Sequence, residues 1–294
     1  MSLPREVHAG ATSLVTRRCL ERRFLLRPSK LTNAIFLFVL AVAAWRFGIR
    51  VHAFCVMSNH FHLVLTDPKG RLPAFMQLLC GVVARAMNLV LGRQDHFFEA
   101  GSYNAVELPT AEDILRKVVY VLANPVAEAL VRRGNLWPGL WSHPEWVGGK
   151  ALPAPQPKGF FSGEGVLPKL AKLALRVPPG FASAEEFRRR LWPALRERED
   201  ELARGGVSFL GVARVLRTRP TDRPRTKEDG GHQVPRHAAA DDAVREVLEE
   251  RFAAFKKAYA EALVRWREGR RSVVFPAGTY LMRVLHGAAC APAG

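Results

Sequence analysis

The chain has 294 residues, 48% of them hydrophobic, and a formal net charge of +17. This hydrophobic content excludes a largely disordered chain and is enough for a substantial core. The excess of basic residues favours a polyanionic partner, either nucleic acid or an anionic membrane surface; the alternative is a merely solvated surface rich in arginine.

The first part of the chain alternates strands and helices with clear end signals. Ser29 is a suitable N-cap and Gly48 a suitable end for an apolar helix between them. The apolar run from Ala34 to Trp45 is shorter than the ~20 residues that span a bilayer, so we predict a buried helix and no membrane partner. The predicted elements are a strand from Leu14 to Leu20, a helix from Leu31 to Phe47, and strands from Ile49 to Met57 and from His60 to Thr66.

A second helix, a short strand and a third helix follow. Apolar residues at helical spacing predict a helix from Leu72 to Leu91, and a strand is expected from Ala105 to Leu108. Thr110, with Asp113 after it, resembles a capping box and begins a helix that runs to about Asn124. The order strand, helix, strand, strand, helix, strand predicts an α+β fold, a ferredoxin-like antiparallel sheet with helices on one face, followed by an extra helix.

The composition changes after Trp146. Gly148-Gly149 and the segment from Pro153 to Pro157 are typical of a linker. A mainly helical C-terminal extension is expected beyond it, with a helix from Ser183 to Leu202, a basic run from Arg214 to Lys227 and an amphipathic helix from Asp241 to Arg267. We therefore divide the chain into a catalytic domain at 1–148, a linker and basic helical extension at 149–231, and a C-terminal helical accessory region at 232–294.

The cysteine pattern indicates a reducing compartment. Cys19, Cys55, Cys80 and Cys290 show no CxxC spacing, and no signal peptide is recognised. Reduced thiols in a cytoplasm are therefore the expectation.

The hairpin around Ser58-Asn59 carries a candidate metal site. Residues i and i+2 of a strand share a face, so His60 and His62 project side by side and Phe61 points to the buried face. Two imidazoles on one face form half of a metal site; the alternative is a surface strand with two polar residues. A two-residue turn would pair Met57 with His60 and Cys55 with His62, which leaves a structural zinc site open as a further alternative.

Tyr120 lies outside the apolar stripe of its helix. Its neighbours one turn away are Arg116, Lys117 and Asn124, so the tyrosine is predicted on a polar face. A phenol beside basic residues suits nucleophilic attack on a phosphodiester. Two alternatives stay open: Tyr120 is an ordinary tyrosine at a helix rim, and Asn124 only caps a following helix that begins at Pro125.

Two segments resemble a known family. The segment from Val51 to Val64, with His60-Phe61-His62, resembles the histidine-hydrophobic-histidine (HUH) motif of the single-strand tyrosine transposases. It looks most like the branch associated with repetitive extragenic palindromic (REP) sequences. The segment from Tyr120 to Val126 resembles the catalytic tyrosine segment of the same family, and the resemblance covers roughly Ala11 to Ser142.

The resemblance implies a mechanism and a set of site residues. Members of the family cut single-stranded DNA beside hairpins through a 5′-phosphotyrosine link and rejoin it without ATP or another nucleotide cofactor. It implies Tyr120 as nucleophile, His60, His62 and Asn124 as ligands of Mg²⁺ or Mn²⁺, and a prokaryotic protein, monomer or homodimer, that is nucleoid-associated when bound to DNA. The expected DNA contacts are Arg17, Arg18, Arg85, Arg93, Arg116 and Lys117.

Two other functions fit parts of the pattern. One is a non-catalytic ferredoxin-like DNA- or RNA-binding protein or a domesticated regulator, which would need no metal. The other is a replication initiator or relaxase of the HUH class, which often carries two nearby tyrosines, whereas this helix offers only Tyr120. The C-terminal extension is expected to add DNA contacts through Arg214, Arg217, Arg219, Arg223, Arg225 and Lys227.

Overall fold

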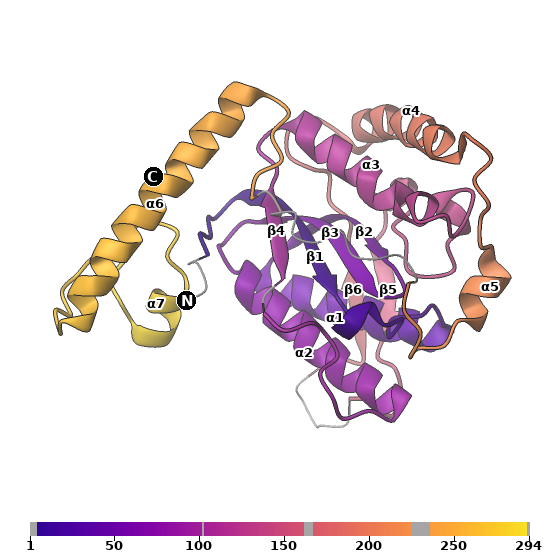
Figure 1. Cartoon of the computed structure of the whole chain (residues 1–294), viewed down its shortest axis with the longest axis horizontal. Coiled ribbons are helices and arrows are strands. Elements are labelled where there is room, and N and C mark those ends of the chain that lie inside the picture. Colours follow the sequence, from indigo (N-terminus) through magenta and orange to yellow (C-terminus); the bar gives the residue numbers. More distant parts are fainter. Residues whose placement is uncertain (1–4, 102, 162–166, 225–235, 293–294) are drawn as a thin grey trace.

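A four-stranded antiparallel sheet forms the centre of the protein (Figure 1). The computed structural model describes residues 5–101, 103–161, 167–224 and 236–292. The strands are β1 (Ala11–Arg18), β2 (Arg50–Val56), β3 (His60–Asp67) and β4 (Asn104–Glu107), in the order β2-β3-β1-β4. With α1 (Lys30–Phe47) after β1 and α2 (Leu72–Leu91) after β3, this is the predicted ferredoxin-like arrangement.

Helices cover both faces of the sheet. On one face α1 packs beside α2, and Phe36 of α1 meets Phe61 of β3 with ring centroids 5.0 Å apart. On the other face lies the extra helix α3 (Ala111–Ala127), which meets the same strand through Tyr120 and His62. The alternation of side chains along β3 therefore assigns aromatic residues to the core and histidines to the α3 side.

The predicted helix boundaries agree closely with the structure. The hydroxyl of Ser29 accepts a hydrogen bond from the amide of Thr32, and Gly48 ends α1 with a φ of 70°. The hydroxyl of Thr110 accepts from the amide of Asp113 at the start of α3. The capping alternative for Asn124 is wrong, because α3 continues through Pro125 to Ala127.

The apolar run from Ala34 to Trp45 lies within α1, as a core helix. By length and composition both α1 and α2 would be able to cross a membrane. In the structure, however, α1 lies between the sheet and a small second sheet, and most of its apolar residues are buried. Such a buried core helix meets the same test of length and composition.

The segment expected to be a linker forms a strand. β5 (Leu152–Pro155) pairs with β6 (Leu170–Leu173) in a two-stranded sheet that packs on α1. The linker prediction is therefore wrong for Pro153 to Pro155. Prolines are tolerated at a sheet edge because the N–H that they lack would have no partner there.

The rest of the chain is mainly helical. α4 (Ala184–Ala203) packs on α3, and its N-cap is Ser183. α6 (Asp242–Arg267) has its own small core, in which Ala262 packs with Phe275, Met282 and Ala288. The remaining elements are the short helices α5 (Val212–Arg217) and α7 (Leu281–His286) and the 3₁₀ turns Leu20–Arg22, Gly134–Leu136 and Pro144–Trp146. Arg225 and Lys227, from the predicted basic run, lie outside the described residues.

His52 of β2 anchors the segment after β6 to the sheet. Its Nδ1 lies 2.8 Å from the carbonyl oxygen of Arg176, and its Nε2 lies 2.7 Å from the hydroxyl of Thr66. Burial lowers the pKa of His52 to about 4, with the bond to Arg176 opposing that shift.

We expect His52 to make the protein less stable in mild acid. The unfolded chain takes up a proton on this imidazole near pH 6.5, whereas the folded chain does so only near pH 4. The free energy of unfolding should therefore fall by about 3 kcal/mol between these values. Denaturant unfolding of wild type and H52Q from pH 7 to pH 4 should show their stability difference shrinking as the pH falls; a constant difference would contradict it.

Candidate metal and nucleophile site

The two histidines of the hairpin lie side by side. β3 begins at His60 directly after the Ser58-Asn59 turn, and the amide of Met57 donates to the carbonyl of His60 at 2.8 Å. The ring centroids of His60 and His62 are 4.7 Å apart. Cys55 is the β2 partner of His62, so the predicted register is confirmed.

The Nδ1 atom of each imidazole is held by a neighbouring polar group. Nδ1 of His60 lies 2.7 Å from Oδ1 of Asn59, and Nδ1 of His62 lies 2.8 Å from the hydroxyl of Thr16. Nε2 of His62 is buried and has no hydrogen-bond partner among the described residues. Holding one ring nitrogen while leaving the other available is the usual preparation of a metal-binding histidine.

The electrostatics keep both imidazoles neutral. Burial lowers the pKa of His60 to about 4, and Arg18 adds to that shift. Burial also lowers the pKa of His62 well below its ordinary value, with contributions from His60 and Arg18. Since a metal ion binds the neutral imidazole, this environment favours the ligand form at neutral pH.

Asn124 supplies a third donor beside the histidines. Its side chain is buried, and its Oδ1 has no hydrogen-bond partner within the described chain. An interaction with the Asn124 side chain raises the pKa of His60, which places the amide beside that imidazole. Two imidazoles and an amide oxygen form an open donor set that suits a hard divalent ion.

The zinc alternative gains no support from Cys55. Its Sγ lies 3.6 Å from Sδ of Met57, and burial raises the pKa of the thiol far above its ordinary value. Zinc binds the thiolate, which this environment disfavours. The described residues contain no group of three or more His, Cys, Asp and Glu side chains placed to hold a metal.

Tyr120 of α3 faces the histidine pair of β3. Its ring centroid lies 5.4 Å from that of His62, and the side chain is 44% exposed. Lys117 Nζ lies 5.5 Å from the centre of the same ring. Partial burial raises the pKa of Tyr120, Glu128 adds to the shift and Arg18 opposes it, so the phenol is protonated at neutral pH.

The predicted DNA contacts separate into two groups. Arg18 and Lys117 lie at the site, where they act on His60, His62 and Tyr120. Arg17 points to the opposite sheet face, because side chains alternate along β1, and it donates to the carbonyls of Glu99 and Gly101. Their contact with DNA stays a prediction.

The other three arginines lie away from the histidines. Arg85 is exposed on α2, on the far side of the sheet, and Arg93 lies just beyond the end of that helix near Asp95. Arg116 is on α3 with Tyr120, but its guanidinium binds the carboxylate of Asp113 and the carbonyl of Ala238. A role for these three in DNA binding likewise stays a prediction.

Sequence reasoning missed four residues that shape the site. Thr16 and Asn59 hold the imidazoles, and Arg22 is near enough to lower the pKa of His60. Trp141, far along the chain, donates from Nε1 to the carbonyl of Leu122 at 2.9 Å. Only the strand register or tertiary contacts identify these groups, apart from Asn59, which adjoins the histidine motif.

The turn of α3 that carries Tyr120 and Asn124 is held from outside the helix. Pro125 lacks an amide hydrogen, so the carbonyl one turn before it loses its helical partner. Trp141 bonds the neighbouring carbonyl of Leu122, and the backbone of Gly134 packs against the same oxygen. The amide of Gly134 in turn donates to the buried carboxylate of Glu199 at 2.7 Å.

Comparisons with known proteins give distant likenesses in fold. No protein-family model and no curated protein matches the sequence. A solved structure of a REP-associated tyrosine transposase bound to a REP hairpin aligns with a TM-score of 0.40 and 15% identity, covering 47% of this chain and 81% of that chain. A candidate transposase from Deinococcus radiodurans R1 aligns with a TM-score of 0.29 and 19% identity, covering 42% of this chain and 97% of that one. At these scores the likenesses assign neither a family nor a role to any residue.

We expect the donor set to bind Mn²⁺ in the absence of DNA. H60A and H62A should each weaken binding by more than about tenfold, because each removes a ligand, and N124A should weaken it less. Titration calorimetry and the Mn²⁺ paramagnetic resonance signal measure this directly. H96A, at an exposed histidine, is the matched control. Equal affinity in wild type and H62A would place the metal elsewhere.

We also expect Gly134 to be required for the geometry of α3. A Cβ at Gly134 would lie 2.4 Å from the carbonyl oxygen of Leu122, so G134A must displace the helix or the loop. The expected cost is about 2–4 kcal/mol in unfolding free energy, together with weaker Mn²⁺ binding. The variant W141F removes the hydrogen bond from the indole N–H to the carbonyl of Leu122 and leaves Gly134 unchanged. In the control G81A, within α2, the added Cβ would make only an ordinary contact with the Arg85 side chain at 3.7 Å, so this variant should be neutral or stabilising.

Proposed function

We propose that this protein is a metal-dependent tyrosine transposase that cleaves and rejoins single-stranded DNA. The proposal rests above all on one observation: Tyr120, from a helix, lies against His62, from a strand 58 positions earlier, at 5.4 Å between ring centroids. Asn124 lies beside His60 at the same place. A nucleophile and three neutral donors thus share one partly open site.

The chemistry that these residues support is a transfer of phosphoryl linkage. The Tyr120 oxygen forms a bond to phosphorus, the bond from phosphorus to the 3′ oxygen breaks, and the leaving strand takes a proton to become a 3′-hydroxyl. The half-exposed phenol releases its own proton to solvent. Reversal with a new 3′-hydroxyl rejoins the strand, so no nucleotide cofactor is consumed.

Each neighbouring group has a separate task in that transfer. Arg18 and Lys117 place positive charge beside the phenol and the scissile phosphate, which stabilises negative charge on the non-bridging oxygens. Thr16 and Asn59 fix the orientation of the imidazoles. A divalent ion held by His60, His62 and Asn124 would act as a Lewis acid at the phosphate, and Mg²⁺ or Mn²⁺ suits these donors.

The proposed partner is a single strand that carries a hairpin next to the cut. This rests on the resemblance of the two sequence motifs to the REP-associated branch and on the net charge of +17. The action takes place in the cytoplasm, at the nucleoid. Arg214 and the basic residues after it would lengthen the contact with the strand.

The reading as an RNA-recognition type of binding protein has less support. Such domains stack bases on aromatic residues of an open sheet face. Here α3 covers the histidine face, while α1 and α2 cover the other. The sheet therefore offers no open aromatic platform within the part of the chain that the structure describes.

Capture of a covalent adduct tests the proposal. Wild-type protein, incubated with a library of single-stranded DNA hairpins and Mg²⁺ or Mn²⁺, should form an adduct stable to denaturation, and sequencing should place it at one cut site. Y120F should form none while it binds DNA with nearly unchanged affinity. Y259F removes a hydroxyl from α6 and is the matched control. An adduct in Y120F would move the nucleophile to another residue.

A further inference from the structure

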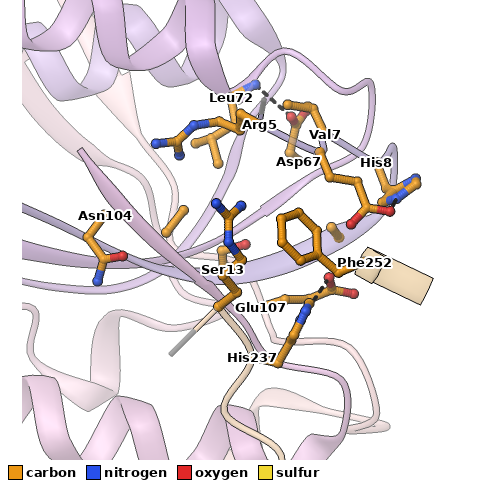
Figure 2. Close-up of a pocket in the computed structure, with 14 residues that line it drawn as sticks. Arg5, Val7, His8, Ser13, Asp67, Leu72, Asn104, Glu107, His237 and Phe252 are labelled. Atoms are coloured by element: carbon orange, nitrogen blue, oxygen red, sulfur yellow. Dashed lines mark hydrogen bonds and ion pairs between the residues drawn. The ribbon is translucent and has the colours of Figure 1, made fainter. Parts of the chain in front are cut away.

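A polar cavity lies at the opposite end of the sheet from the histidine pair. It has a volume of about 230 Å³ and lies between the N-terminal segment, β4, the start of α2 and the segment that leads into α6 (Figure 2). Ser13 of β1 and Glu107 of β4 line it, on the sheet face that α2 covers. It shares no lining residue with the candidate catalytic site.

The carboxylates around the cavity already have partners. Glu107 accepts from Arg251 at 2.6 Å, and Glu6 lies 3.3 Å from the same guanidinium and 2.6 Å from His8. Asp67 accepts from the amides of Leu72 and Lys69 at the start of α2. The carboxylates of Glu6, Asp67 and Glu107 therefore already bind donors of the protein itself.

Two groups at the cavity that can donate hydrogen bonds, the side chains of Arg236 and His237, form no hydrogen bond within the described chain. Arg236 stacks on Phe252, 4.0 Å from the ring centroid, and its guanidinium has no hydrogen bond or ion pair within the described chain. Burial and the nearby Arg5 lower the pKa of Arg236, which indicates that the two guanidinium groups repel each other, while Glu6 at the cavity wall opposes that shift. An anion between them would relieve that repulsion.

His237 gives an independent sign of a ligand. Its side chain is only 8% exposed, and both ring nitrogens are buried without a hydrogen-bond partner among the described residues. The nearest carboxylate oxygen, on Glu107, is 3.6 Å from Nδ1, beyond a normal hydrogen bond. Figure 2 shows His237, Arg5 and Asn104 around the cavity, each from a different segment. Buried polar groups of this kind normally have a partner.

We propose that this cavity is an anion site that takes one phosphate group, held by Arg236 and His237 with Arg5 beside them. The volume admits a phosphate with a small attachment and excludes a duplex. Arg236 offers the planar, two-pronged geometry that matches a phosphate. The bound phosphate group belongs either to the DNA strand or to a free phosphate or mononucleotide. Only the first of these rests on the proposed function.

The test uses the full chain and titrates inorganic phosphate by calorimetry. Wild type and Y120F should bind phosphate alike, whereas R236Q and H237Q should each lose about tenfold or more in affinity. R245Q is the control, since it removes the same charge from an exposed position on α6. Thermal unfolding without phosphate shows whether R236Q and H237Q are folded.

Comparing the ligands shows where the bound phosphate comes from and whether a negative result concerns this site or the proposed function. If a short single strand with a 5′-phosphate loses affinity in R236Q, and its unphosphorylated form does so less, the ligand is a strand phosphate. If R236Q loses affinity for free phosphate but not for the strand, the anion site is supported and its ligand is a small molecule. This conclusion would stand even if the protein cleaved no DNA. Equal phosphate affinity in wild type, R236Q and H237Q overturns the proposal, as does an equal loss in R245Q or equal binding of acetate.

Discussion

The pairing of β1 with β3 determines where every group of the candidate site lies. In this register Thr16 is opposite His62 and Arg18 is opposite His60, so a hydroxyl and a guanidinium are delivered to the histidine face. A shift of β3 by one residue would turn both histidines to the side of α1 and α2, away from Thr16 and Arg18. The large residue Phe61, fully buried against Phe36, opposes such a shift because it has no place on the polar face.

α3 adds a nucleophile and a third donor to the two imidazoles of the strand. A strand alone offers two imidazoles in a row, and both remain neutral because burial outweighs every other influence on their pKa values. The helix adds Tyr120 and Asn124 one turn apart, the first near solvent and the second buried. This difference in exposure suits their proposed tasks, since a nucleophile must reach a strand while a ligand must be held in one position by the groups packed around it.

Much of the fold follows from local patterns. Ser29, Gly48 and Thr110 mark helix ends by side-chain and backbone preferences that operate within a few residues. The hairpin register follows from its two-residue turn, and so does the position of Cys55 opposite His62. The nearness of Tyr120 to the histidines was indicated by the family resemblance of the motifs and not by any local physical rule.

What could not be predicted depends on contacts between distant segments. Pro153 and Pro155 are typical of a linker in the sequence alone. They form a strand because β6 pairs with this segment and both strands pack on α1. Trp141 and Gly134 gain their role only when they meet the carbonyl of Leu122. Likewise Arg5 and His237 are separated by most of the chain, so no sequence window brings them to one cavity.

The separate small core of α6 and α7 gives the protein more than one cooperative unit. Ala262, Phe275, Met282 and Ala288 pack with one another and not with the main core. Charged contacts of Arg251 with Glu6 and Glu107 contribute to the junction with the rest of the chain, and such contacts weaken as ionic strength rises. Local opening around Phe275 and Met282 thus requires no exposure of the sheet. Such an arrangement lets this end of the chain vary in evolution, or be exchanged, while the histidines and the tyrosine keep their places.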